Sequence, residues 1–162
     1  MTLPFTFRSE VVPADAQAVE QLVRATGFFN AEETAIAVEL VTERLAKGPA
    51  SGYWFVMAEE GAKLAGYACY GPIGGTACSH DLFWIVVDPA IQRRGLGRQL
   101  VARAEEAIRA MGGCRVYIET STRGQYQPTR GFYDQAGYRL EAVLEDFYGP
   151  GDGKAVYVKV VG

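Results

Sequence analysis

Apolar residues recur along this chain with two different periods, one typical of helices and one typical of strands. Four segments carry their apolar residues on one helical face. The predicted helices span 15–26, 30–48, 95–111 and 128–135. The second helix has a clear start signal, because Asn30 is followed three residues later by Glu33, the spacing of a capping box. Pro128 suits the first turn of the fourth helix, where its missing N–H costs nothing.

Short segments rich in β-branched and aromatic residues separate these helices and predict strands. The predicted strands span 5–12, 53–59, 63–70, 81–87, 114–119, 138–145 and 154–161. The second and third are separated by Glu60-Gly61-Ala62, which favours a hairpin. The strand 81–87 is almost wholly apolar, which indicates a place in the middle of a sheet. Neither a repeat nor a linker interrupts the order β-α-α-β-β-β-α-β-α-β-β, so we expect one α/β domain spanning residues 1–162.

Composition narrows the class of protein. The chain has 162 residues, of which 49% are hydrophobic and 22% charged. These values are typical of a globular protein and argue against disorder or a small disulfide-stapled scaffold. The formal net charge of −3 argues against nucleic acid as a partner. The longest apolar run, 82–87, is too short to span a membrane, and no signal peptide is apparent, so we expect a cytoplasmic protein.

The cysteines give no framework for a metal or a disulfide. Cys69, Cys78 and Cys114 are an odd number without a CxxC pair, and His80 is the only histidine. This pattern argues against a zinc site and favours reduced thiols. We expect Cys69 and Cys114, which fall within predicted strands, to be buried as small apolar residues.

The most informative segment runs from the buried strand into the long helix, over residues 86–98. Gly95 and Gly97 leave the backbone bare where the helix begins, so that several unpaired N–H groups can face one anion. Arg93, Arg94 and Arg98 surround that point in a chain whose net charge is negative. The pattern predicts a phosphate-binding turn. The simpler alternative is a glycine turn flanked by solvated arginines.

Two motifs together resemble the GNAT superfamily of N-acetyltransferases. Gln92-Arg93-Arg94-Gly95-Leu96-Gly97 matches the Gln/Arg-x-x-Gly-x-Gly/Ala motif of that family, and Arg130-Gly131-Phe132-Tyr133-Asp134-Gln135-Ala136-Gly137-Tyr138 is similar to its Phe-Tyr-x-x-x-Gly-Phe/Tyr element. The resemblance implies a single-domain α/β fold with a mixed, mostly antiparallel sheet flanked by helices. It also implies transfer of an acetyl group from acetyl-CoA, without a metal, to a primary amine of a small molecule or peptide by direct attack.

The resemblance further implies where acetyl-CoA binds. The pyrophosphate would lie on the amides of the glycine turn, and the pantetheine arm along the end of the preceding strand. The stretch after the fifth long strand departs from the family pattern, because the usual asparagine is missing and Tyr126 or Thr129 would take over its contact. The expected cofactor-binding residues are Ile85, Val86, Val87, Gln92, Arg93, Arg94, Gly95, Leu96, Gly97, Arg98, Tyr126 and Thr129.

Direct attack requires an acid for the leaving thiolate and a base for the acceptor ammonium. Tyr133 occupies the position of the acid in many family members; its alternative role is an aromatic packed between helix and sheet. Asp81 and Glu119 lie at strand positions used for the base in different relatives. Either could instead be a solvated strand end, with a water chain as the base.

The acceptor side is less constrained by the sequence. The family resemblance places Phe28, Phe29, Asp146 and Tyr148 on the walls of the acceptor site, and Glu145, Asp146 and Asp152 would form an acidic mouth that attracts a cationic amine. The same acidic loop could simply be solvated. An apolar last strand, containing Val156, Val158 and Val160, could pair with a second copy in a homodimer. The rival reading of the whole chain is a non-catalytic acyl-CoA-binding or sensing domain.

Overall fold

A single twisted sheet organises the computed structural model, which describes residues 4–162. The described residues form seven strands in the order β1-β2-β3-β4-β5-β7-β6, and every neighbouring pair is antiparallel except β4 and β5, which are parallel. The strands are β1 (Thr6–Arg8), β2 (Trp54–Glu60), β3 (Lys63–Pro72), β4 (Ser79–Val87), β5 (Arg115–Ser121), β6 (Arg139–Gly149) and β7 (Asp152–Val160). The predicted mixed, mostly antiparallel sheet is confirmed.

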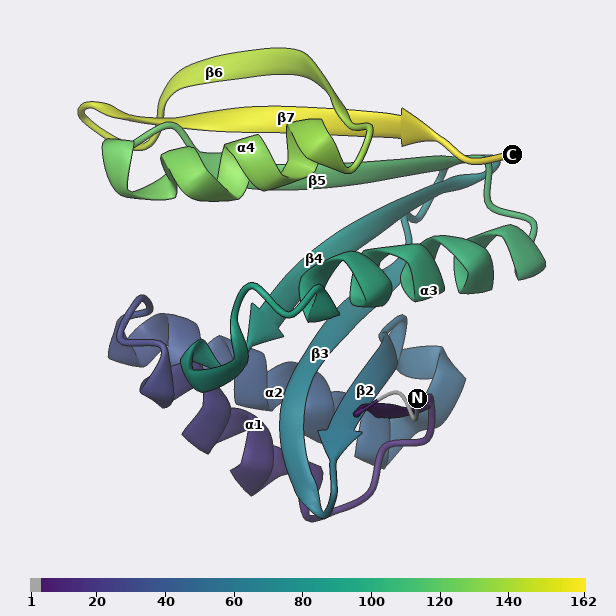
Figure 1. Cartoon of the computed structure of the whole chain (residues 1–162). Coiled ribbons are helices and arrows are strands. Elements are labelled where there is room, and N and C mark those ends of the chain that lie inside the picture. Colours follow the sequence, from purple (N-terminus) through teal and green to yellow (C-terminus); the bar gives the residue numbers. More distant parts are fainter. Residues whose placement is uncertain (1–3) are drawn as a thin grey trace.

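The parallel pair opens into a V (Figure 1). β4 and β5 are paired only over Ser79↔Arg115, His80↔Val116 and Asp81↔Tyr117, after which the two strands diverge. β4 nevertheless remains paired with β3 on its other side as far as Val87. The later part of β4 therefore has one edge that is not paired with a strand and faces the gap.

Helices cover both faces of this sheet. α3 (Leu96–Ala110) and α4 (Gln127–Gln135) lie on one face, and α1 (Asp15–Ala25) and α2 (Ala31–Lys47) lie on the other (Figure 1). Short 3₁₀ turns η1 (Gly48–Ser51), η2 (Pro89–Ile91) and η3 (Gly124–Tyr126) complete the chain. The predicted helices are confirmed to within a few residues at each end. The predicted capping box is also present, because Asn30 Oδ1 accepts from Glu33 N at 2.8 Å and Glu33 Oε1 accepts from Asn30 N at 3.1 Å.

The two faces have separate cores. On the α3 and α4 face, Leu96, Leu100, Ala104 and Ile108 of α3 are fully buried, at the helical spacing that the sequence predicts. On the other face, α1 and α2 cover a second cluster, which includes Val19, Val23, Val41, Phe55 and Tyr67. The sheet is therefore fixed from both sides, while the gap between β4 and β5 is left uncovered by strand pairing.

Two elements differ from the prediction. The first strand ends at Arg8 instead of residue 12, because the Arg8 guanidinium binds Asp15 at 2.6 Å and Glu59 at 2.7 Å and the chain turns there toward α1. The last strand, β7, lies between β5 and β6, so both of its edges are already paired. Pairing of two copies through the edge of this strand is therefore wrong as a prediction. The edge strand on this side is β6.

The cysteine prediction is also wrong in part. Cys78 and Cys114 form a disulfide, with Cα atoms 5.3 Å apart, and only Cys69 is free and buried. Each of the bonded cysteines directly precedes one of the two parallel strands, and the pairing Ser79↔Arg115 brings them together. Reduced thiols are thus right for Cys69 alone, and Cys114 is not the buried strand residue expected.

Residues 4–162 contain neither a membrane-spanning helix nor a cluster of metal ligands. None of their helices combines the length and the hydropathy required to cross a membrane. No group of three or more His, Cys, Asp or Glu side chains in that range could hold a metal ion.

Candidate active site

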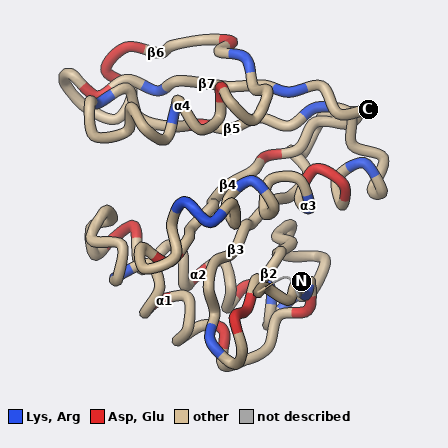
Figure 2. Tube along the Cα trace, in the orientation of Figure 1, with Lys and Arg blue, Asp and Glu red and all other residues tan. Residues whose placement is uncertain are grey.

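The turn between β4 and α3 has the geometry of an anion site. Gly95 precedes α3 with φ of 81°, and Arg93 also adopts a positive φ of 70°, which is unusual for a residue with a side chain. No side chain caps α3, so the amides of its first turn have no partner of that kind among the described residues. Basic residues gather at this helix start (Figure 2). The turn therefore presents backbone N–H groups and positive charge to the same point.

The three arginines of the turn are not equivalent. Arg94 Nη2 lies 2.8 Å from Glu60 Oε2 and its guanidinium stacks on Phe5. Arg98 Nη2 donates to the carbonyl of Gln135 at 2.7 Å. Arg93 makes no ion pair within residues 4–162, and it is exposed. The backbone amides and Arg93 are consequently the groups of this turn that have no partner among residues 4–162.

The second glycine of the motif serves packing. A Cβ atom at Gly97 would lie 3.3 Å from the ring of Phe132 and 3.9 Å from Val87. The start of α3 can therefore approach α4 only because residue 97 has no side chain. This close approach sets α4, and with it Tyr133, beside the anion-binding turn.

The remaining predicted cofactor residues lie along the two arms of the V. Ile85, Val86 and Val87 form the end of β4, which is paired with β3 and not with β5. Tyr126 and Thr129 are half-buried residues of the opposite arm, in η3 and α4. Of the other members of the set, Gln92 is exposed and Leu96 directs its side chain into the core.

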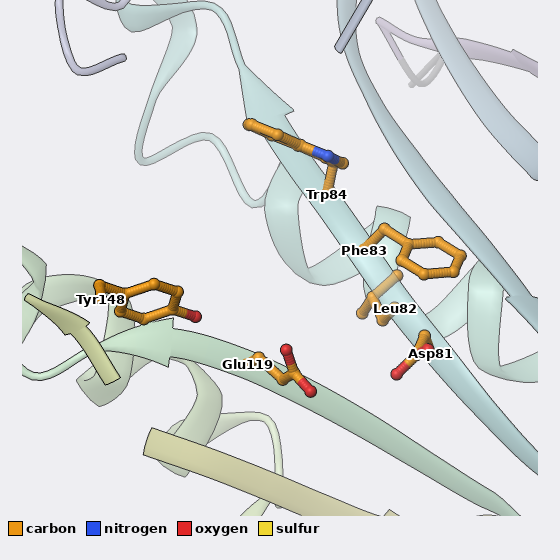
Figure 3. A pocket seen from close by; sticks show the side chains of 6 residues that line it. All are labelled: Asp81, Leu82, Phe83, Trp84, Glu119 and Tyr148. Atoms are coloured by element: carbon orange, nitrogen blue, oxygen red, sulfur yellow. The ribbon is translucent and has the colours of Figure 1, made fainter. Parts of the chain in front are cut away.

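A cleft of about 240 Å³ lies where β4 and β5 separate. It is lined by Asp81, Leu82, Phe83, Trp84, Glu119 and Tyr148. Figure 3 shows the carboxylates of Asp81 and Glu119 in the space between the two strands, with the Tyr148 hydroxyl turned toward Glu119. The structure thus brings together the two base candidates, which are far apart in the sequence, with one predicted acceptor residue.

The two carboxylates have different surroundings. Burial, reinforced by the nearby charge of Glu119, raises the pKa of Asp81 to about 6, against a smaller opposing effect of Lys154. Glu119 is instead paired with Lys154, whose Nζ lies 3.0 Å from Glu119 Oε1. Of the two, only Asp81 has no hydrogen-bonded or ion-paired partner among residues 4–162.

Tyr133 lies on the opposite face of the sheet from these carboxylates. Val116 and Ile118 of β5 are buried in the same core as Tyr133, and Glu119 follows Ile118, so its side chain points to the other face. Tyr133 is buried and its ring contacts those of Phe132, Tyr138 and Tyr157. Burial raises the pKa of Tyr133 well above its usual value, so the hydroxyl keeps its proton near neutral pH.

The predicted aromatic wall spans the open side of the V. Phe28 packs against Tyr126 with ring centroids 4.7 Å apart, and Phe29 packs against Trp84 at 5.0 Å. The two phenylalanines also contact each other at 5.4 Å. This short turn between α1 and α2 therefore connects β4 of the cleft with the η3 segment on the other arm.

Two of the three carboxylates predicted to form an acidic mouth in the last hairpin, those of Asp146 and Asp152, are held by neighbouring groups. Asp152 lies 3.2 Å from Arg123 and also accepts from the Ser121 hydroxyl. Asp146 adopts a positive φ of 55° and its Oδ1 accepts from Gly151 N at 2.8 Å. Asp146 does not line the cleft, whereas Tyr148 does. Asp146 therefore shapes the hairpin.

Sequence reasoning missed four residues of the cleft region, namely Leu82, Phe83, Trp84 and Lys154. The β4 strand carries a bulge where Phe83 has no partner in β3, since Cys69 pairs with Trp84 and Tyr70 with Leu82. An apolar run predicts burial on both faces and gives no sign of such a bulge. Lys154 belongs to no motif, and only the pairing of β5 with β7 brings it beside Glu119.

Comparisons with known proteins agree with this geometry. Residues 17–138 match the model of the acetyltransferase (GNAT) family. A crystal structure of a GNAT-family protein from Desulfovibrio desulfuricans has a TM-score of 0.96 and 47% identity, covering 98% of this chain and 99% of that one. The blasticidin-S acetyltransferase of Streptomyces morookaense is 37% identical over 105 residues, which are 59% of this chain and 73% of the relative.

More distant structures share the fold. An aminoglycoside 6'-N-acetyltransferase complexed with coenzyme A has a TM-score of 0.78 at 18% identity, covering 97% of each chain. The family match, the relatives and the anion-binding turn at the opening of the V lead to one conclusion: this chain belongs to the GNAT family and is an N-acetyltransferase.

Proposed function

We propose that this protein transfers the acetyl group of acetyl-CoA to the primary amine of a small molecule by direct attack, with Asp81 as base and Tyr133 as acid. The observation that carries this proposal is the placement of a partner-free carboxylate at the opening of the V, across the sheet from a protonated tyrosine. The similarity to a relative named for blasticidin-S favours a small molecule over a peptide.

The described residues fit acetyl-CoA, which when bound supplies the acetyl group as a thioester. The amides at the start of α3 and the side chain of Arg93 would hold the pyrophosphate, because they are the groups at that turn without another partner. The edge of β4 at Ile85–Val87 would offer backbone N–H and C=O groups to the pantetheine amides and an N–H to the thioester carbonyl. Tyr126 and Thr129 would border the same arm from the other side.

Asp81 is a better base than Glu119. A base must be ionised before it can accept a proton, and a pKa of about 6 leaves Asp81 largely ionised at about pH 7 while keeping its basicity close to that pH. Glu119 is instead held in an ion pair with Lys154. Asp81 would thus orient the acceptor ammonium and take its proton, while Glu119 stays paired with Lys154.

Tyr133 supplies the other proton. Its hydroxyl stays protonated because burial raises its pKa, and the packing of its ring against Phe132, Tyr138 and Tyr157 holds it in one orientation. Tyr133 would donate to the departing thiolate from the α4 side while Asp81 acts from the opposite face. Separation of acid and base across the sheet prevents one from neutralising the other.

Steady-state kinetics test direct transfer. We expect amine-dependent release of CoA with intersecting initial-velocity patterns when acetyl-CoA and amine are both varied. Intact-mass spectrometry of the protein after incubation with acetyl-CoA alone should show no added acetyl group. Parallel velocity patterns together with an acetylated protein would contradict direct attack and indicate a covalent intermediate.

A further inference from the structure

The acceptor cleft holds an uneven set of charges, and this inference about its substrate rests on the function proposed above. Asp81 and Glu119 line the cleft, and Lys154 of β7 reaches Glu119 from the other side of β5. The Lys154 ammonium lies 3.0 Å from Glu119 and 4.2 Å over the ring of Phe147. Its side chain is only 15% exposed, so it is held in place by its surroundings.

Asp81 and Glu119 are the only charged residues among those that line this cleft, and Glu145 and Asp146 lie outside its lining. Asp152 is paired with Arg123, and Asp146 is bonded to the hairpin backbone. Because Lys154 balances Glu119, the cleft retains one uncompensated negative charge, that of Asp81. This charge matches one ammonium group. A second ammonium close to the first would meet the positive charge of Lys154 without a carboxylate of its own.

The remaining walls are aromatic. The bulge in β4 leaves Phe83 without a partner in β3, and Phe83, Trp84 and Tyr148 of β6 all line the cleft. Phe83 is 38% exposed and Tyr148 is 50% exposed, so part of each ring is accessible. Flat aromatic faces provide stacking surface for a ring and attract a cation above them.

We propose that the acceptor is an amine with a single positive charge carried on an aromatic body, and that Lys154 is the residue that discriminates against diamines and polyamines. Lys154 acts on specificity by removing one of two negative charges from the site. The aromatic walls favour the ring, and the single free carboxylate orients the amine.

Four probe amines test this proposal in the full-length protein: phenethylamine, hexylamine, 1,6-diaminohexane and spermidine. In the wild type we expect kcat/KM to be highest for phenethylamine, and at least about tenfold lower for 1,6-diaminohexane than for hexylamine. In Lys154→Met, the ratio of 1,6-diaminohexane to hexylamine should rise about tenfold, mainly through KM, while Lys154→Arg should retain the wild-type ratio. Lys47→Met, which removes an exposed lysine of α2 that is paired with Glu43, is the matched control and should change nothing.

Binding is measured alongside turnover, by calorimetry of each amine with the CoA-bound protein. If no amine releases CoA, the proposed function fails, and the order of amine affinities alone decides the specificity proposal. A wild type that takes spermidine or 1,6-diaminohexane as well as phenethylamine would overturn it. The proposal would also be overturned if folded Lys154→Met had the wild-type ratio of kcat/KM for 1,6-diaminohexane to that for hexylamine. If the thermal melt of Lys154→Met shows loss of folding, Lys154→Gln replaces it.

Discussion

Asp81 shows most clearly how the fold converts an ordinary residue into a functional one. It is the last residue of β4 that pairs with β5, so the divergence of the strands begins at its position. Partial burial and the nearby Glu119 raise its pKa to about 6, whereas the same carboxyl on an open strand end would titrate near its usual value. Sequence alone identified Asp81 and Glu119 but could not choose between them. The choice depends on Lys154, a neighbour supplied by β7.

The first prediction concerns the pH dependence of the reaction. Because we propose the ionised form of Asp81 as the base, kcat/KM should fall as the pH drops below about 6, with a slope of one proton. Asp81→Asn should lower kcat by about 10²–10⁴ and abolish that acidic limb. Glu119→Gln is the matched control and should affect KM for the amine more than kcat. Equal loss of kcat in both variants would contradict the assignment of the base to Asp81.

The raised pKa of Asp81 also affects stability, and in the opposite direction from activity: activity should rise with pH, whereas the stability that Asp81 contributes should fall. Folding favours the protonated form, so the contribution of Asp81 to stability is present below its unfolded-state pKa and is lost as the pH rises through about 6. Asp81→Asn removes the free-energy cost of keeping an ionised carboxylate partly buried above that pH. We expect the variant to melt at or above the wild-type temperature at about pH 8, which thermal melts from about pH 4 to pH 8 would check. A large drop in melting temperature would show that Asp81 is structural.

Tyr133 provides a further test of the proposed mechanism. Tyr133→Phe removes one oxygen and leaves the contacts of the ring with Tyr138 and Tyr157 in place. We expect kcat to fall, toward the lower end of the range of about 10²–10⁴ because a thiolate leaves readily, while CoA affinity and the melting temperature change little. Equal kcat for the two proteins from about pH 6 to pH 9 would remove Tyr133 from the mechanism.

The junction of β4 and α3 is the element that the sequence described best. Gly95 and Gly97 were both predicted to bare the backbone, and the structure separates their roles, since Gly95 adopts a positive φ and Gly97 makes room for Phe132. Helices α1 to α4 were predictable because their apolar spacing and end signals are local. Three other features could not be predicted, because each depends on which strands become neighbours. They are the bulge in β4, the unpaired segment of β6 between Leu144 and Gly149, and the pairing of Cys78 with Cys114.

A pair of variants at Gly95 tests this element. Gly95→Asn and Gly95→Asp place side chains of nearly the same size at the same positive φ, where both cost some stability. Only aspartate adds a negative charge beside the anion site. Calorimetry should therefore show CoA affinity reduced at least about tenfold more by Gly95→Asp than by Gly95→Asn. Equal affinities of the two folded variants would mean that no phosphate binds at this turn.

At the scale of the whole molecule, the sheet works as a V that is closed at one end. The closed end is held by three residue pairs between β4 and β5 and by the disulfide directly before them. Because Asp81 belongs to the last of these pairs and Glu119 lies two residues beyond its partner Tyr117, the distance between the two carboxylates depends on how firmly this end is held. The sequence predicted the order of the elements but not this closure, since an odd number of cysteines does not say which two meet.

Thiol titration tests the closure. The denatured protein should expose one free thiol, that of Cys69, before reduction and three after it. The crosslink joins residues that are 36 apart in the sequence, so the chain-entropy model gives it about 4 kcal/mol of stabilisation. Cys78→Ser with Cys114→Ser should lower the free energy of unfolding by up to that amount in denaturant titrations. Three free thiols without reductant would contradict the disulfide.

We propose that the opening between β4 and β5 lets acetyl-CoA, bound on the α3 and α4 face of the sheet, meet an amine on the opposite face. The most direct measurement follows CoA release and the acetylated amine in the same reaction, with phenethylamine as the acceptor. We expect CoA and the acetylated amine to form in equal amounts. The rate should depend on the concentrations of protein and amine, and it should fall in Asp81→Asn. Tight binding of CoA without any amine-dependent release, across a panel of primary amines, would contradict the account and identify the protein as a non-catalytic acyl-CoA-binding domain.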